Sequence, residues 1–326
     1  MQTVTRRSAL VAAMLTPVGL LRARSADAQE SAVGNFGPAP EFTGISAWLN
    51  SPPLTMAQLR GKVVLIDFWT YSCINCLRTL PYVTRWYDTY RDKAFVVVGV
   101  HTPEFAFERI TANVQTAIGR FGIKYPVAQD NAMATWRAYS NQIWPSEYLV
   151  NQSGEIVLRH FGEGRYDETE NAIRSLLSAG PKVAADNGVD LSRIRSPEMY
   201  FGSSRVEMLA NPATHGPGAT TYTVPDLLPP NHFALAGSWA LSPEFATLKA
   251  DGGGVALAFQ SGKVFMVASS PQPVTLGVTV DGKPQPPVTV QESRLYTLYD
   301  STNYATHIMS ISIPKAGLQA FNFTFG

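Results

Sequence analysis

The chain has 326 residues, a hydrophobic content of 45% and a formal net charge of +1. This length allows two domains of ordinary size, each with its own packed core. The near-neutral charge gives no electrostatic basis for binding nucleic acid, and the 25 glycines and 23 prolines argue against an all-helical fold.

The first 28 residues have the features of an export signal. Arg6 and Arg7 precede an apolar run over residues 9–21, and a small-x-small cleavage site follows at residues 26–28. The paired arginines resemble a twin-arginine signal for export of folded proteins, although they fit an ordinary secretory signal too. We therefore predict a periplasmic or otherwise extracytoplasmic protein that is soluble after signal cleavage.

Residues 34–180 alternate between apolar runs of strand length and helical patterns, which predicts an α/β domain. Unbroken Val/Ile-rich runs at 62–68 and 94–100 are typical of buried central strands. A strand, turn and strand are predicted over 148–160. Helices are predicted at 74–90, about 105–121, 131–140, and from a capping box at Asp167 and Glu170 to about 179.

Residues 181–326 have a different composition. The stretch from 181 to 232 is rich in Pro, Gly, Ser and Asn, which indicates a linker with little regular structure. Short alternating runs follow, separated by turn signals at 251–254, 261–263 and 281–283. This part predicts a linker and an all-β, jelly-roll-like sandwich.

Cys73 and Cys76 are the only cysteines, and they stand between a predicted strand and a predicted helix. Positions i and i+3 are neighbours in a helical turn, so a disulfide can form and break there with little backbone movement. The free N–H groups and positive dipole end of the helix stabilise a thiolate at Cys73. Cys73 is thus the predicted nucleophile and Cys76 the thiol that resolves a mixed disulfide.

Other interpretations of the two cysteines are a zinc pair, a structural disulfide and two buried free thiols. Zinc needs about two further ligands, and the five histidines show no ligand spacing, so no metal is predicted. A structural bridge is common in exported proteins, but one that closes two intervening residues constrains the unfolded chain little.

Several positions around the cysteines carry a family resemblance. Asp67-Phe68-Trp69 places an acid six residues before the first cysteine, Pro81 follows that cysteine by eight residues, and residues 143–146 put Pro145 directly before a strand. These residues resemble a TlpA-like thioredoxin-fold domain over residues 34–180, and the stretches HTPEF (101–105) and FGEGRYDETE (161–170) resemble the DipZ-type pattern. With residues 181–326 added, the chain resembles the exported C-terminal region of DipZ-type proteins, in which a carbohydrate-binding-module-like β-sandwich follows.

The chain departs from these families beside the dithiol. Ser72 stands where TlpA-like proteins usually have tryptophan, and Ile74-Asn75 replaces the Gly-Pro of thioredoxin. Because the intervening pair is a main control on reduction potential, the direction of electron flow stays open.

The resemblance implies roles for residues near the cysteines. Pro145 would form a cis-proline loop that docks a partner chain, and Trp69, Trp144 and Glu104 would border the substrate groove. Trp144 fits a core position nearly as well, and Glu104 fits an exposed helix start equally well. Asp67 is the candidate proton acceptor for the second cysteine, because a buried carboxyl has a raised pKa; a strand-end Asp bonded to backbone amides is the alternative.

The predicted activity is thiol–disulfide exchange, and the resemblance to TlpA-like proteins implies that it reduces cysteines of partner proteins. No bound cofactor is expected, since the dithiol carries two electrons, and a separate membrane protein would supply them. Tyr222, Trp239 and Tyr304 could bind a glycan, although a sandwich core is their default place. The alternatives are a glycan- or protein-binding module on a redox-inactive scaffold, or a thiol peroxidase suggested by the fragment Thr70-x-x-Cys73.

Overall fold

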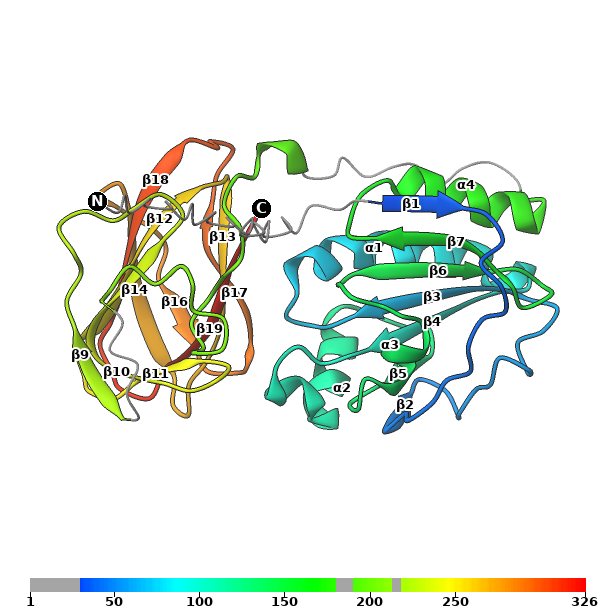
Figure 1. Cartoon of the computed structure of the whole chain (residues 1–326), viewed down its shortest axis with the longest axis horizontal. Coiled ribbons are helices and arrows are strands. Elements are labelled where there is room, and N and C mark those ends of the chain that lie inside the picture. Colours follow the sequence, from blue (N-terminus) through cyan, green and yellow to red (C-terminus); the bar gives the residue numbers. More distant parts are fainter. Residues whose placement is uncertain (1–29, 180–189, 213–217) are drawn as a thin grey trace, which may run out of the picture.

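The computed structural model describes residues 30–179, 190–212 and 218–326, which form two units side by side (Figure 1). The predicted export signal lies outside these ranges. Within them, no helix is both long and apolar enough to cross a membrane.

The first unit is built on a seven-stranded sheet in the order β1-β7-β6-β3-β4-β5-β2. The central strand β3 pairs in parallel with β4 and antiparallel with β6. Every residue of β3 is buried, as its unbroken apolar run predicts. The strands are β1 (Glu30–Val33), β2 (Ala47–Leu49), β3 (Val63–Trp69), β4 (Phe95–His101), β5 (Val127–Gln129), β6 (Ser146–Val150) and β7 (Ile156–Phe161).

Helices cover both faces of this sheet. Helices α1, α2 and α4 pack on the face that presents Leu65 and Trp69 of β3, whereas α3 packs on the face that presents Phe68. Asp67 shares the face of Leu65 and Trp69, because alternate residues of a strand point the same way. The helices are α1 (Ile74–Tyr90), η1 (Arg91–Lys93), η2 (Ala106–Arg109), α2 (Thr111–Arg120), α3 (Ala134–Ala138), α4 (Tyr166–Leu177) and η3 (Leu191–Arg193), the η elements being 3₁₀ turns.

The helix predicted over about 105–121 is instead two elements. The 3₁₀ turn η2 ends at Arg109, Ile110 is extended, and α2 begins at Thr111. The side chain of Glu108 points inward and accepts hydrogen bonds from the backbone N–H groups of Glu104 and Phe105. These bonds close a separate short turn ahead of α2.

The capping box predicted at Asp167 and Glu170 is wrong. Helix α4 begins one residue before Asp167, after Arg165 has adopted the left-handed conformation at φ 50°. Glu170 lies further along the helix, where it accepts a hydrogen bond of 2.9 Å from the Tyr90 hydroxyl. The helix predicted at 131–140 is also shorter, covering Ala134–Ala138 after left-handed Met133.

The second unit is an antiparallel sheet of twelve strands that curls into two layers. Strand β10 belongs to both layers: Phe233–Ala236 pairs with β12, and the following residues pair with β9. The chain bends between these halves at Gly237, whose φ of 87° favours glycine. Buried aromatic and aliphatic side chains fill the space between the layers, which confirms the predicted all-β sandwich.

Most strands of the second unit follow residue 232, but β8 and β9 lie in the stretch predicted as a linker, because they pair with β19 and β10. The strands of this unit are β8 (Met199–Tyr200), β9 (Ala219–Tyr222), β10 (Phe233–Leu241), β11 (Ala246–Leu248), β12 (Gly253–Gln260), β13 (Lys263–Ser269), β14 (Val274–Val280), β15 (Lys283–Pro284), β16 (Val288–Val290), β17 (Arg294–Asp300), β18 (Thr306–Ile313) and β19 (Gln319–Phe325).

The two units share an apolar contact. Phe321 of β19 packs against Phe105 and Phe107 beside η2, with ring centroids 5.2 and 4.8 Å apart. Phe321 and Val267 belong to the same buried cluster as the side chains under α1. The second unit therefore completes part of the core next to the two cysteines.

Candidate active site

The two cysteines lie at the start of α1, and both are free thiols. Cys73 is the N-cap residue, with an extended backbone, and its Sγ accepts the N–H of Cys76 at 3.4 Å. Cys73 is half-buried, whereas Cys76 is buried one turn further in. The outer sulfur is thus accessible, and the inner one lies directly behind it.

The inner thiol needs a proton acceptor in order to react. Burial raises the pKa of the Cys76 thiol, and its hydrogen bond with Cys73 raises it further. Asp67 lies beneath it on β3, and its own pKa is raised by burial and then by the charge of Glu147. Neither Asp67 oxygen has a hydrogen-bond partner among the described residues, so the alternative of a carboxylate bonded to backbone amides does not apply.

A buried carboxyl group holds the loop that precedes Cys73. The Oε1 atom of Glu108 accepts hydrogen bonds from the Ser72 hydroxyl at 2.6 Å and the Ser72 N–H at 3.3 Å. Burial raises the pKa of Glu108 to about 7, and the Ser72 hydrogen bond opposes this rise. Ser72, which departs from the TlpA-like pattern, thus has a specific partner on η2.

The proline loop lies at the same end of the sheet. The Trp144–Pro145 peptide bond is cis, and β6 begins with Ser146, which pairs with Phe68 of β3. Trp144 is half-buried and donates its Nε1–H to the carbonyl of Thr102 at 3.1 Å. Trp69 is fully buried, so it lies in the core beneath the dithiol and not along a surface groove.

Glu104 lies at the junction of the two units and not at an exposed helix start. Its carboxylate accepts hydrogen bonds from the Tyr200 hydroxyl at 3.0 Å and from Arg205 at 2.8 Å, both in the second unit. The guanidinium of Arg205 also stacks on the Tyr200 ring, 3.7 Å from its centroid. Glu104 therefore connects the second unit to the turn that Glu108 closes.

Arg78 and Glu163 form part of the site that the sequence did not predict. The Arg78 guanidinium binds both carboxylate oxygens of Glu163 at 2.7 and 2.5 Å. It also donates to the Asn75 side chain at 2.7 Å and to the Phe325 carbonyl at 3.1 Å. Through Arg78, Asn75, the second of the two residues between the cysteines, is linked to Glu163 and to the last strand of the second unit.

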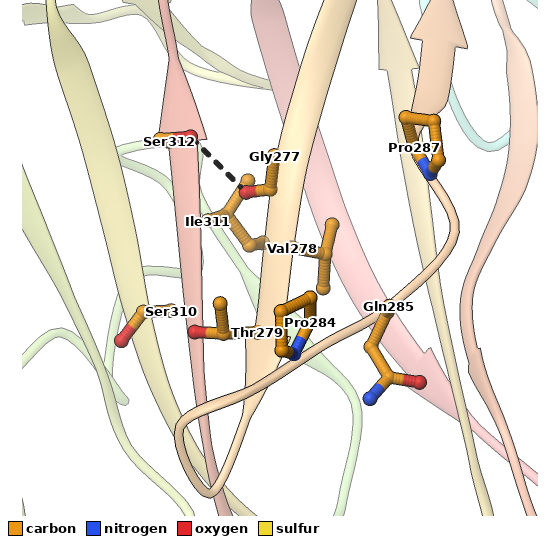
Figure 2. A pocket seen from close by; sticks show the side chains of 9 residues that line it. All are labelled: Gly277, Val278, Thr279, Pro284, Gln285, Pro287, Ser310, Ile311 and Ser312. Carbon is orange, nitrogen blue, oxygen red and sulfur yellow. Dashed lines mark hydrogen bonds between the residues drawn. The ribbon is translucent and has the colours of Figure 1, made fainter.

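The aromatic residues considered for glycan binding are mostly in the core. Tyr222 and Trp239 are buried between the layers of the sandwich. A shallow pocket of about 330 Å³ lies elsewhere on this unit, between β14, β18 and the segment 284–287 (Figure 2). Its lining includes Ser310 and Ser312 but no aromatic ring, so it offers no stacking platform for a sugar.

No group of three His, Cys, Asp or Glu side chains in the described ranges could hold a metal ion. The chemical groups of the site are therefore three. They are the dithiol at the start of α1, the buried Asp67 beneath it and the cis-proline loop beside it. With the α/β sheet, they define the class: a thioredoxin-like protein with a dithiol at the start of a helix.

Comparison with known proteins agrees with this class. A family model described as Redoxin matches residues 34–196, and one described as Thioredoxin like C-terminal domain matches residues 196–326. Thiol-disulfide oxidoreductase YkuV of Bacillus subtilis is 35% identical over 39% of this chain and 84% of its own length. The chain belongs to the redoxin family.

Protein DipZ of Mycobacterium tuberculosis is 37% identical over 94% of this chain and 46% of DipZ, so the chain spans less than half the length of this relative. The expected resemblance to DipZ-type proteins is confirmed. Among solved structures, a thiol-disulfide isomerase from Corynebacterium glutamicum is 25% identical over 44% of this chain and 98% of its own, with a TM-score of 0.38.

Proposed function

We propose that the chain is an extracytoplasmic oxidoreductase that reduces disulfides of partner proteins through Cys73 and Cys76. The observation that carries this proposal is the arrangement of the two sulfurs. Cys73 is half-buried at the N-terminus of α1, and Cys76 is buried one turn behind it. An accessible nucleophile with a protected second thiol suits stepwise exchange.

The reaction proceeds in two exchanges. The Cys73 thiolate attacks one sulfur of the partner's disulfide, which breaks that bond and releases the other partner sulfur as a thiolate. Cys76 then gives its proton to Asp67 and attacks the Cys73 sulfur, forming the Cys73–Cys76 disulfide and releasing the second partner thiolate. The dithiol loses two electrons, the partner's disulfide gains them, and the partner thiolates take protons from solvent.

The proline loop positions the partner. Pro145 has no N–H, and its loop lies beside the carboxyl end of β3, which leads into the cysteines. An extended partner segment can pair there with backbone groups next to the dithiol. Electrons return to the oxidised chain from a separate membrane protein, as the similarity to DipZ suggests.

The test is reduction of insulin disulfides by the mature protein with dithiothreitol as the electron source. The wild type should accelerate the reaction, and Cys73→Ser should abolish the acceleration. Cys76→Ser should still form the mixed disulfide but fail to release it, which distinguishes the two roles. Equal rates for wild type and Cys73→Ser would rule out the proposal and favour a binding module, while cysteine-dependent consumption of peroxide without insulin reduction would favour a peroxidase.

The reduction potential of the dithiol decides the direction of electron flow. It can be followed by tryptophan fluorescence in glutathione or dithiothreitol buffers, because Trp69 shares a buried cluster with Cys76. A reductant should have a potential below about −220 mV, whereas a value near about −120 mV would make the chain a disulfide donor.

A further inference from the structure

A second buried carboxyl group lies next to Asp67. Glu147 on β6 is directly opposite Asp67 on β3 in the antiparallel register. The two side chains are 2% and 1% exposed. Residues directly opposite each other in such a pair point to the same face, with Cβ atoms about 5 Å apart.

Few hydrogen bonds stabilise negative charge on this pair. Both Asp67 oxygens and Oε1 of Glu147 have no partner among the described residues. The Oε2 atom of Glu147 accepts a hydrogen bond of 2.9 Å from Thr169 on α4. Two ionised carboxylates would therefore be costly here, because burial without hydrogen bonds disfavours each charge and each charge disfavours the other.

His160 is the next residue across the sheet after Asp67 and Glu147, but it carries no positive charge that would balance a carboxylate. His160 on β7 lies opposite Glu147, with Nδ1 3.9 Å from Glu147 Oε2 and 3.4 Å from the Thr169 hydroxyl. Burial lowers the pKa of His160 to about 4, and the nearby Arg165 lowers it as well. The imidazole is thus neutral at pH 7.

The other ionisable groups around the pair are thiol and phenol groups, which are neutral at pH 7. The charge of Asp67 acts on the Cys76 thiol of α1 and on Tyr125, and the charge of Glu147 acts on Tyr125 and on Tyr166 of α4. Burial raises the pKa of Glu147 to about 7, and the Thr169 hydrogen bond opposes this rise. The charge of Glu147 in turn raises the pKa of Asp67 beyond the effect of burial, so the two carboxyl groups interact as they titrate.

We propose that Glu147 is a positioning residue for proton transfer, whose negative charge beside Asp67 makes Asp67 a stronger base for the proton of Cys76. This inference rests on the proposed function. The Thr169 hydrogen bond favours the negative charge on Glu147, so the proton that Cys76 releases goes to Asp67, whose oxygens have no hydrogen-bond partner among the described residues. The Cys76 proton then moves to Asp67, the Cys76 electron pair forms the bond to the Cys73 sulfur, and the partner thiolate leaves with the electrons of the broken bond.

The test is titration of the Asp67 carboxyl carbon by ¹³C NMR in the reduced protein, which does not depend on activity. Glu147→Gln keeps the size of the side chain and an acceptor for Thr169 but removes the charge. It should lower the midpoint of Asp67 by about one pH unit, since a neighbouring like charge raises a carboxyl pKa. The acid limb of mixed-disulfide release should move to lower pH by the same amount, while formation of the mixed disulfide stays unchanged.

Two further variants complete the experiment. Thr169→Val removes the hydrogen bond that favours ionised Glu147, so it should raise the Glu147 midpoint, and it provides the readout if Glu147→Gln does not fold. Glu207→Gln, at an exposed position of the second unit, should leave the Asp67 midpoint unchanged. An Asp67 midpoint that is the same in wild type and Glu147→Gln would overturn the inference but leave cysteine-dependent insulin reduction standing. Failure of the proposed function would instead appear as a wild type without that reduction, whatever the NMR titration gives.

Discussion

In the proposed mechanism, proton transfer at the inner thiol depends on Asp67. It is buried under Cys76 and has no hydrogen-bond partner in the described structure. An amide of the same shape at this position would keep the packing but could not take a proton. The identity of this one side chain therefore separates the two exchange steps.

Asp67→Asn should slow release of the mixed disulfide on the order of 10- to 100-fold and leave its formation unchanged, because general bases contribute factors of this size or larger. Stopped-flow measurement of each step with a disulfide-bonded peptide checks this. Asp88→Asn, on the exposed side of α1, is the matched control. If both steps slow equally, Asp67 has a structural role and not a role in proton transfer.

The residues that sequence alone could identify were those with a fixed spacing. Cys73, Cys76 and Asp67 were predicted from the order of strand, loop and helix, and Pro145 from the family resemblance. Glu147 was missed, because a lone acid in a sequence is usually exposed. A signal did exist: Glu147 lies two residues before Leu149 of a predicted strand, so it shares the face of that apolar residue.

Between β4 and α2, the short turn η2 determines the geometry of the loop before Cys73. Glu108 on this turn binds Ser72 as well as the N–H groups of Glu104 and Phe105. The pKa of Glu108 is raised to about 7, so its burial destabilises the fold as pH rises from about 4.5 to about 7, where the unfolded chain is already ionised. The Ser72 hydrogen bond offsets part of this loss once Glu108 is ionised.

Ser72→Ala should lower the free energy of unfolding by about 2 kcal/mol above pH 8, since hydrogen bonds to charged groups contribute about this much. Near pH 5, where Glu108 is neutral in the folded chain, the loss should be smaller. Urea unfolding at both pH values measures the difference. Ser203→Ala, at an exposed position, is the control, and an equal loss for Ser72→Ala at both pH values would contradict the prediction.

Elements with one strong local signal were predicted well, and elements decided by distant contacts were not. The helix at 74–90 was predicted with its observed bounds, because the cysteines and the apolar period define it locally. The break at Ile110 could not be predicted, since it depends on a bond from Glu108 to Ser72, 36 residues away in the sequence. The start of α4 depends likewise on Arg165 and on packing of Glu170 against Tyr90.

The two units of the molecule are joined next to the active site. Glu104 binds Tyr200 and Arg205, and Phe321 packs on Phe105 and Phe107. Both contacts reach the segment that Glu108 connects to Ser72. The second unit therefore supports the loop that carries Cys73, in addition to any ligand that it binds.

Phe321→Ala should destabilise the molecule by about 3 kcal/mol, the usual cost of removing a buried phenylalanine side chain. Because its contacts cross between the units, we also expect calorimetry to show one unfolding transition for the wild type and two for Phe321→Ala. Leu227→Ala, whose side chain is 82% exposed, should change neither property. A single transition at an unchanged temperature in Phe321→Ala would show that the units are coupled elsewhere.

The bond from Arg78 to the Phe325 carbonyl has a practical consequence for handling the protein. It brings the last strand beside Asn75, and Gly326 is paired there with Lys263. An affinity tag or reporter fused after Gly326 would extend from the molecular surface next to the cysteines. It would then compete with protein partners for access to the dithiol. Fusions for partner capture are therefore better placed in an exposed turn far from the dithiol, such as the one at Asp281 and Gly282.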